Sequence, residues 1–347
     1  MTEMPPPHTS AFDGPPPEDP RTALQEALQE IKQVIVGQDA MLERLLVALL
    51  AGGHVLLEGV PGLAKTLTIK TMSEVLGGSF ARVQFTPDLV PADIIGTRIY
   101  RPNSGDFETS LGPVFANFVL ADEINRAPAK VQSALLEVMQ EGQVTIAGTT
   151  YEVPKPFIVM ATQNPIESEG TYPLPEAQVD RFLMKVLVDY PTVSEESAVV
   201  GRSLAGGRGV RELLSLERLE HFRRVTKEVN VERDVIAYAV ALTDATRNPA
   251  NHGLPELTGQ IEHGASPRGS IGLVHAARVL ALLRGRGHAT TQDVRDLARD
   301  VLRHRLVLSY DALASGTSSD DVLERVLEKV SDPNGARLTK RQRVQAA

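Results

Sequence analysis

The sequence of 347 residues contains no cysteine. This absence excludes disulfide bonds, zinc–thiolate sites, iron–sulfur clusters and thiol catalysis. The eight histidines are scattered, and none lies in an HExxH or similar metal-binding pattern. Long apolar runs are absent too: the longest, residues 45–51, is far short of the roughly 18 residues that a membrane-spanning helix needs. We therefore expect neither thiol chemistry nor membrane insertion.

The N-terminal segment lacks lysine, arginine and any apolar stretch, so it does not have the pattern of a signal peptide. Residues 1–20 also hold seven of the 23 prolines. Such a composition cannot bury enough apolar surface to offset the entropy lost on folding. We predict a disordered tail, with a proline-motif ligand as the alternative, and a cytoplasmic protein.

Positive charge is in deficit over the whole chain. Lysine and arginine number 36 against 44 aspartates and glutamates, which gives a net charge of −8. An acidic chain is a poor binder of nucleic acid or anionic membranes, so neither is an expected partner. The hydrophobic and charged fractions, 42% and 23%, are typical of a soluble globular protein. The length fits about two domains.

Apolar periodicity predicts an α/β region followed by a helical one. Five short apolar runs alternate with helical patterns, which predicts a five-stranded parallel sheet between helices. The runs are residues 54–57, 81–85, 118–121, 157–161 and 183–188. After about residue 190 the strand patterns disappear, and the spacing predicts an all-helical second domain. Hairpin patterns at 98–111 and 143–153 predict insertions at the working edge of the sheet.

The strongest motif is the segment GVPGLAKT at residues 59–66. It matches the phosphate loop GxxxxGK[ST], except that Ala64 replaces the last glycine. Because a strand precedes it and a helix follows, its backbone N–H groups are expected to form an anion site. Lys65 would reach the β- and γ-phosphates, and Thr66 would bind Mg²⁺. We expect Ala64 to have helical dihedral angles, where alanine is favoured over glycine.

A second motif is the apolar run at 118–121 that ends in Asp122 and Glu123. A strand of a parallel sheet delivers such side chains to the carboxyl edge, where these sheets bind ligands. We expect Asp122 to hold Mg²⁺ and Glu123 to polarise an attacking water molecule.

Together the two motifs resemble those of the AAA+ ATPases, and further segments narrow the resemblance to the MoxR family. These segments are ADEINRAPAKVQSALLEVMQEGQVT at 121–145, ATQNP at 161–165 and LPEAQVDRF at 174–182. The resemblance covers roughly residues 21–330 and implies an αβα core with a C-terminal helical lid. The implied division is a tail at 1–20, a core at 21–190 with a helix-2 insertion (86–116) and a pre-sensor-1 hairpin (143–155), a lid at 191–331, and a basic tail at 332–347.

The resemblance also implies roles for individual residues. Asn164 matches sensor 1, which helps to position the attacking water. Arg181 matches the arginine finger that reaches the γ-phosphate in a neighbouring subunit, and Arg126 is a second candidate for this role. Arg268 matches sensor 2, expected to contact the nucleotide across the cleft between the domains. The residues implied in nucleotide binding are Val36, Gly37, Gly59, Val60, Pro61, Gly62, Leu63, Ala64, Lys65, Thr66, Leu67, Asp122 and Arg268.

The activity implied by the resemblance is hydrolysis of ATP with Mg²⁺ by a ring, a hexamer, that remodels, assembles or matures partner proteins. A protein with a von Willebrand factor A domain is the implied partner. Two alternatives stay open: the AAA+ subunit of a metal chelatase, and a nucleotide-gated binding switch with little turnover. The presence of Glu123 and Arg181 argues against the switch. The hairpin aromatics Phe107, Phe115 and Tyr151 either face clients or pack beneath the hairpins.

Overall fold

The computed structural model describes residues 19–331, apart from 61, 104, 166–169 and 207–208. The predicted N-terminal tail up to residue 18, the basic tail from 332 onward, and Pro61 lie outside the described residues. No helix in the described part of the chain is both long and apolar enough to cross a membrane.

Five parallel strands form one central sheet in the order β2-β5-β8-β1-β9. The strands are β1 (Val55–Glu58), β2 (Phe80–Gln84), β5 (Phe118–Asp122), β8 (Ile158–Gln163) and β9 (Met184–Leu187). Because all of them run the same way, their last residues meet at one edge, which we call the carboxyl edge. The opposite edge, where the strands begin, is the amino edge. The five-stranded parallel sheet predicted from the sequence is confirmed.

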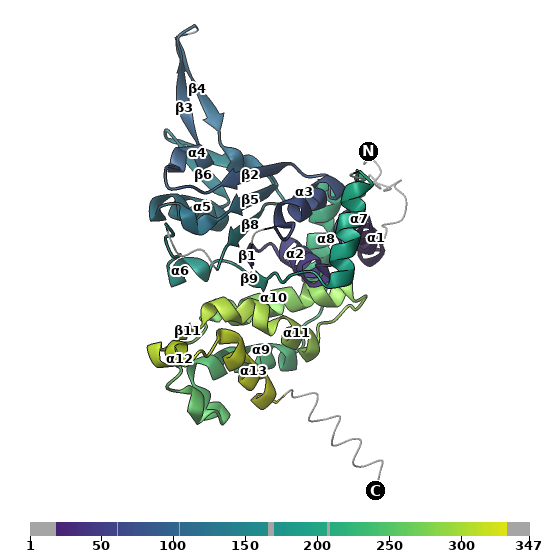
Figure 1. The fold of residues 1–347 in the computed structure, drawn as a ribbon, viewed down its shortest axis with the longest axis vertical. Coiled ribbons are helices and arrows are strands. Elements are labelled where there is room, and N and C mark those ends of the chain that lie inside the picture. The colour runs from purple at the N-terminus through teal and green to yellow at the C-terminus, as the bar shows by residue number, and fades with distance from the viewer. Residues whose placement is uncertain (1–18, 61, 104, 166–169, 207–208, 332–347) are drawn as a thin grey trace, which may run out of the picture.

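Helices cover both faces of this sheet (Figure 1). One face is covered by α1 (Pro20–Lys32), α2 (Asp39–Ala51) and α3 (Lys65–Val75), and the other by α4 (Pro91–Ile95) and α5 (Ala129–Glu141). Alternate strand residues enter separate hydrophobic cores: Leu57 joins the first and Leu56 the second. This alternation is the period of two that a pleated strand imposes. The short α6 (Glu176–Val179) precedes β9.

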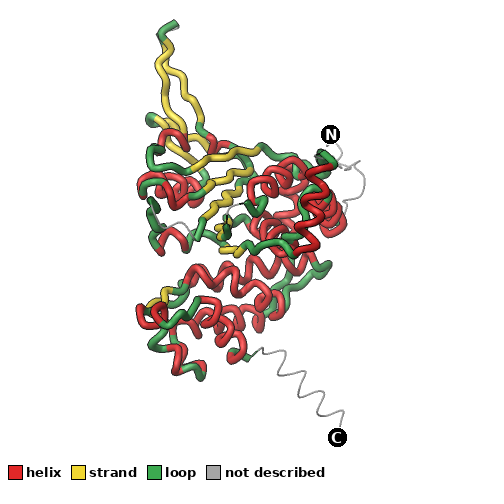
Figure 2. The backbone as a smooth tube through the Cα atoms, in the orientation of Figure 1, coloured by secondary structure: helices red, strands yellow, loops and turns green. Residues whose placement is uncertain are grey.

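Two hairpins extend from the second face. The first pairs β3 (Gly96–Arg101) with β4 (Asp106–Leu111) and projects from the body of the molecule (Figure 2). The second pairs β6 (Gln143–Ile146) with β7 (Thr149–Glu152). Of their aromatic side chains, some are exposed to solvent, where clients could reach them, and others pack beneath the hairpins.

Phe107 is 58% exposed, and its ring centroid lies 5.2 Å from that of Tyr100 on the projecting hairpin. Phe115 and Tyr151 are only partly exposed and pack edge to face at 6.4 Å. The Tyr151 hydroxyl donates to Thr109 Oγ1 at 3.1 Å, which joins the second hairpin to the first. Phe107 is therefore the one of the three that solvent reaches most, whereas the other two pack beneath the hairpins.

The C-terminal part is mainly helical. Its helices are α7 (Val193–Leu204), α8 (Leu216–Glu228), α9 (Arg233–Arg247), α10 (Pro267–Leu283), α11 (Thr291–Leu302), α12 (Tyr310–Ala314) and α13 (Ser319–Lys329). Figure 1 shows α7 and α8 beside α1–α3, while the later helices form a separate layer next to β9.

The prediction of an all-helical region misses a short two-stranded sheet. Its strands are β10 (Ile261–His263) and β11 (Val307–Leu308), which run antiparallel. The two extended connections come together between helices, and pairing satisfies backbone groups that would otherwise lack partners.

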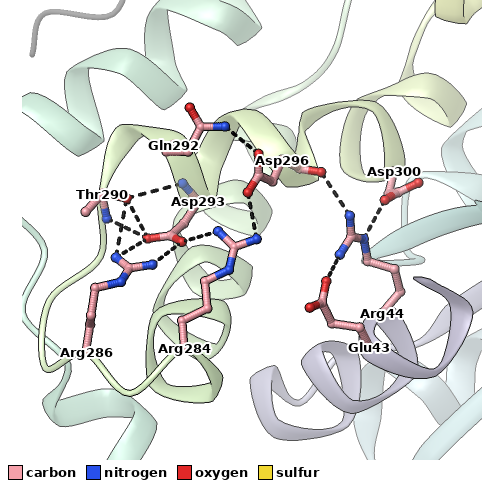
Figure 3. A network of polar contacts seen from close by, with 9 residues as sticks. All are labelled: Glu43, Arg44, Arg284, Arg286, Thr290, Gln292, Asp293, Asp296 and Asp300. Carbon is pink, nitrogen blue, oxygen red and sulfur yellow. Dashed lines mark hydrogen bonds and ion pairs between the residues drawn. The ribbon is translucent and has the colours of Figure 1, made fainter. Parts of the chain in front are cut away.

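A network of ion pairs joins the helical region to α2 (Figure 3). Arg44 on α2 donates to the Asp300 carboxylate at 2.7 Å and to the Asp296 carbonyl at 3.0 Å, both on α11. Arg284 and Arg286 both bind Asp293, whose side chain is fully buried. Burial alone would raise the pKa of Asp293, but hydrogen bonds from Arg286 and Thr290 lower it. The helical region is thereby fixed against the sheet region at α2.

Candidate functional site

The phosphate loop connects β1 to the first turn of α3. Lys65, the first residue of α3, points its Nζ back into the loop and donates to the Gly59 carbonyl at 2.7 Å. A Cβ at Gly59 would lie 2.6 Å from the Val188 carbonyl, so only glycine fits there. The Gly59 N–H donates to the Gln163 carbonyl at 3.3 Å, which fixes the loop beside the end of β8.

Ala64 departs from the expectation made for it. Its φ of +54° and ψ of 17° are left-handed rather than right-handed helical. The chain must reverse here from the loop into α3, which explains why the phosphate-loop pattern calls for glycine at this position. For a residue with a Cβ this conformation costs roughly 1–2 kcal/mol. Ala64 therefore stores backbone strain at the entrance to the helix.

The Asp122–Glu123 pair lies at the end of β5, beside the phosphate loop. Thr162 Oγ1 donates to Asp122 Oδ1 at 2.6 Å and accepts the Glu123 N–H at 2.8 Å. Arg82 Nη2 lies 2.7 Å from Asp122 Oδ2. A single hydroxyl from β8 thus orients both members of the pair.

The Glu123 carboxylate has two donors of its own at this edge. Gln84 Nε2 donates to it at 2.9 Å, and Arg126 Nε lies at 3.0 Å. Arg126, the second candidate for the arginine finger, therefore pairs with an acid of its own chain. The φ of Glu123 is +56°, another left-handed value.

The pKa of Lys65 indicates that the phosphate loop lies near the acid pair. Burial lowers the pKa of Lys65, while the charges of Asp122, Glu123 and Glu58 oppose that shift. These carboxylates therefore lie near enough to the ammonium group for their charges to act on it. Asn164 directly follows β8 and is 8% exposed, next to the strand end that binds Gly59.

The residues present fit a Mg²⁺ ion together with phosphate oxygens. Within its described ranges, the structure shows no group of three or more histidine, aspartate or glutamate side chains arranged so that they could hold a metal ion. Mg²⁺ does not need one, because it usually binds one or two carboxylates, waters and substrate phosphates. Asp122 and the Thr66 hydroxyl at the start of α3 supply oxygen donors of the required kind.

The segment that contains Val36 and Gly37, which the resemblance implies in nucleotide binding, lies across from the end of β9. Gln38 Nε2 donates to the Asp189 carbonyl at 3.0 Å, and a Cβ at Gly37 would come within 2.6 Å of the Glu195 carboxylate. Val36 is half-buried, and Leu67 on α3 is 47% exposed.

Strain concentrates around these segments. Four residues other than glycine have a positive φ in the described chain: Gln38, Ala64, Glu123 and Ala147. Ala64 and Glu123 belong to motifs that the sequence assigned to the nucleotide, and Gln38 directly follows Val36 and Gly37. Such backbone strain clusters at functional sites, where the surrounding structure holds it in place.

Arg181 lies at the other edge of the sheet. The Leu183 N–H donates to the His54 carbonyl at 2.8 Å, which places this segment where β1 begins. Arg181 Nη1 donates to the Leu136 carbonyl on α5 at 3.1 Å. Its Nε is buried and has no acceptor among the described residues.

Arg268 also lies at the amino edge rather than across a cleft from the phosphate loop. Its Nη1 is 3.8 Å from Asp180 Oδ2, and it lines a cavity of about 240 Å³ together with Arg181. The four residues of β1 separate this cavity from the phosphate loop by about 13 Å. The sequence could not indicate this placement, because it depends on how α10 packs against α2 and on a bond from Ser266 Oγ to Asp180 at 2.9 Å.

Arg305 is a further residue of this edge that sequence analysis missed. Its guanidinium donates to Asp180 Oδ1 at 2.8 Å and to the carbonyls of Asp180, Phe182 and Leu183 at 3.2, 2.7 and 3.2 Å. Burial lowers the pKa of Arg305 to about 10, against the opposing charge of Asp180. The side chain thus fixes the backbone on both sides of Arg181. The only sequence signal is a charged run, Arg303–Arg305, within an apolar stretch.

Comparisons with known proteins agree with this architecture. Residues 54–184 match the sequence model of the "ATPase family associated with various cellular activities (AAA)", and residues 258–326 match an "AAA lid domain". The chain is 55% identical to "Chaperone MoxR1" of Mycobacterium tuberculosis, over 89% of this chain and 82% of the relative. It is 32% identical to "Protein MoxR" of Methylorubrum extorquens, over 91% and 96% of the two chains.

A solved structure extends the likeness to three dimensions. It is a putative ATPase from Cytophaga hutchinsonii, with a TM-score of 0.86, 47% identity, and coverage of 90% of this chain and 95% of that one. Fold, motifs and relatives lead to the same assignment. The chain belongs to the MoxR family of AAA+ ATPases.

Proposed function

We propose that the protein hydrolyses ATP with Mg²⁺ in a ring of identical subunits and uses the cycle to remodel or mature partner proteins. One observation carries this proposal. Lys65 and the Asp122–Glu123 pair lie at the carboxyl edge, close enough for their charges to interact, whereas Arg181 lies at the amino edge. Each chain thus holds both halves of a nucleotide site, but at opposite edges of its sheet.

At the carboxyl edge, the loop N–H groups and Lys65 bind the phosphates, and residues 36–38 flank the base. Asp122 and Thr66 hold Mg²⁺, which neutralises charge on the phosphates when bound. Glu123 orients and polarises the attacking water, with Asn164 beside it.

At the amino edge, Arg181 and Arg268 serve the nucleotide of a neighbouring subunit. Their guanidinium groups are always charged and offer several donors to phosphate. Because about 13 Å of strand separates them from their own phosphate loop, they complete a site only when another copy docks. Such head-to-tail contacts close into a ring, for which we propose six subunits.

Partner proteins would meet the ring at the projecting hairpin or through an adaptor. Phe107 and Tyr100 are both more than half exposed there. We propose an adaptor with a von Willebrand factor A domain, protein clients, and action in the cytoplasm. A pull-down with a variant trapped in its ATP state, compared with the ADP state, tests the adaptor, because only a partner that distinguishes the states can be driven by the cycle.

The decisive experiment mixes two inactive variants. Lys65→Ala removes the phosphate contact and keeps the finger, whereas Arg181→Ala keeps the phosphate loop and removes the finger. Each alone should lose turnover, and mixtures should regain part of it at interfaces that join an intact loop to an intact finger. If the two variants co-assemble and no mixing ratio restores activity, Arg181 does not act between subunits.

Glu123→Gln tests the chemistry separately. It keeps the shape of the side chain and removes its charge, so ATP binding should persist while turnover falls by about 10²–10⁴-fold. Steady-state hydrolysis and equilibrium ATP binding measure the two effects. Gln84→Ala, which removes a neutral donor to the same carboxylate, is the matched control and should lose far less. Unchanged turnover in Glu123→Gln would remove this residue from the mechanism and favour the binding switch.

A further inference from the structure

A second cavity lies at the amino edge, outside the nucleotide site proposed above. It measures about 520 Å³ and opens between the ends of α2 and α5 on one side and helices α8 and α10 on the other. Arg223, Arg224 and Lys227 line it from α8, and His275 and Arg278 from α10. It adjoins the cavity that contains Arg181, since His275 lines both.

The lining of this cavity is strongly positive in a chain whose net charge is −8. Five lysine and arginine side chains line it, against one carboxylate, Glu220. That carboxylate is already paired with Arg223 at 2.5 Å. Among the described residues, Lys155 pairs with the exposed Glu152 alone, at 3.6 Å.

Three of the cations have no partner in the described part of the chain. Arg224, Lys227 and Arg278 make no hydrogen bond or ion pair with any residue of the described ranges. The Nε of Arg278 is buried and has no acceptor. A buried donor without an acceptor is costly, and structures normally satisfy it.

The pKa of His275, which lies on α10, reflects the positive charge of this cavity. Burial lowers the pKa of His275, and the charges of Arg278 and Lys227 lower it further. The surrounding side chains therefore disfavour another positive charge and favour an anion. Arginine binds phosphate oxygens through several donors at once, and three unpaired cations match the charge of more than one phosphoryl group.

We propose that this cavity is a binding site for a small phosphoryl-bearing anion, separate from the phosphate loop. Phosphate oxygens would accept from Arg278, Arg224 and Lys227. A ligand held there would join α8 and α10 to the ends of α2 and α5, and would therefore stabilise the position of the helical region on the sheet. The site does not depend on the proposed hydrolysis.

The test uses the full-length Lys65→Ala protein, so that the phosphate loop does not contribute, with inorganic tripolyphosphate as the probe. Isothermal titration calorimetry should show binding that weakens as salt concentration rises. Arg278→Gln and, separately, Arg224→Gln should each weaken it by about 10- to 100-fold. Arg278→Lys keeps the charge and should retain part of the affinity.

Arg233→Gln is the matched control, because it removes an exposed arginine outside the cavity that has no partner in the described chain. It should leave binding unchanged. Arg224 is exposed, so its replacement tests the site without disturbing folding. Absence of binding in the Lys65→Ala protein, or equal losses in Arg233→Gln and Arg278→Gln, would overturn the proposal. The proposal would also be overturned if Arg278→Gln and Arg224→Gln lost self-association and tripolyphosphate did not bind at all. The cavity would then be a contact surface for a neighbouring copy of the chain.

Discussion

The two edges of the central sheet are built in contrasting ways. At the carboxyl edge, the phosphate loop and Glu123 rest on strained backbone and on separate side chains: Lys65 donates to its own loop, Thr162 and Arg82 hold Asp122, and Gln84 and Arg126 hold Glu123. At the amino edge, one buried arginine from the helical region, Arg305, binds the whole segment around Arg181.

This contrast matches what each edge is proposed to do. A site that takes up and releases a nucleotide in every cycle benefits from groups that are preorganised by separate contacts, since each group can then move independently. A segment that responds to a neighbouring subunit must instead move as one body with the part of the chain that drives it. The pair between buried Arg305 and half-buried Asp180 supplies that connection, at the desolvation cost of removing the Arg305 charge from water.

Arg305→Met removes the donors that hold the segment around Arg181 at the amino edge, and it should have the largest effect on turnover. Without its donors, the backbone around Arg181 is free to shift, and a displacement of about 1 Å can cost about 10²-fold in rate. We expect turnover to fall by about 100-fold while ATP binding persists. Mixing with Lys65→Ala should restore activity, as for Arg181→Ala, because the fault lies in a segment that serves the neighbour.

Arg303→Met is the matched control for that experiment. Arg303, two residues earlier, bonds Asp300, Asp320 and the Lys185 carbonyl, and in the described chain it bonds no residue of 180–183. It should affect stability more than turnover. If Arg305→Met loses ATP binding together with turnover, or mixing restores nothing, Arg305 has a structural role only.

The amino edge should also respond to acid. Burial lowers the pKa of His54 to about 4 from 6.5, with a smaller contribution from the Arg223 charge; its bond to the Met139 carbonyl opposes the shift. The folded chain thus stays neutral at His54 while the unfolded chain takes up a proton. The contribution of neutral His54 to the free energy of unfolding is fully present above pH 6.5. It is lost as pH falls toward 4, by up to about 3 kcal/mol.

Denaturant unfolding between pH 7 and pH 4 measures this effect. His54→Gln retains a donor and an acceptor for Met139 and Val159 but cannot ionise, so its stability should vary less with pH than that of the wild type. Burial also lowers the pKa of His304, so part of the slope should remain in the variant. His263→Gln, at an exposed position, should keep the full slope. An unchanged slope in His54→Gln would contradict the prediction.

Ala64→Gly tests the backbone strain at the carboxyl edge and should cause the smallest change among these variants. Glycine adopts a positive φ without the Cβ clash, so the variant should be more stable to denaturant by about 1 kcal/mol. Ala147→Gly is the matched control, since Ala147 also has a positive φ, +50°, but lies in the second hairpin. Both should gain stability, and only Ala64→Gly should alter ATP affinity. A loss of stability in Ala64→Gly would show that the loop favours alanine.

Local features of this chain were accessible from the sequence. The capping boxes that begin α11 and α13 pair Thr290 with Asp293 and Ser318 with Asp321, residues that lie within one helical turn of each other. The strands differ from the predicted runs by one or two residues, because apolar spacing and turn residues act over short distances. The phosphate loop and the acid pair could be predicted for the same reason, because each is defined by residues that lie close together in the sequence.

Features that depend on tertiary packing were not accessible. The left-handed conformation of Ala64 reflects the direction in which the loop enters α3, and alanine itself gives no sign of it. Arg268 begins a helix whose position is determined by contacts with α2 and Asp180, far away in the sequence. Arg305 carries no motif, because it acts through backbone carbonyls, which any residue provides.

The projecting β3–β4 hairpin has a consequence for aggregation. A two-stranded ribbon in solvent presents free backbone groups along both outer edges, and exposed rings such as Phe107 add adhesive surface. Its charges counteract this tendency: Arg98 lies over the Phe107 ring at 4.9 Å, and Arg101 pairs with Glu108 at 2.6 Å. A second ribbon that paired edge to edge would have to strip water from these charged groups. The ribbon can therefore carry aromatic side chains into solvent without serving as a template for aggregation.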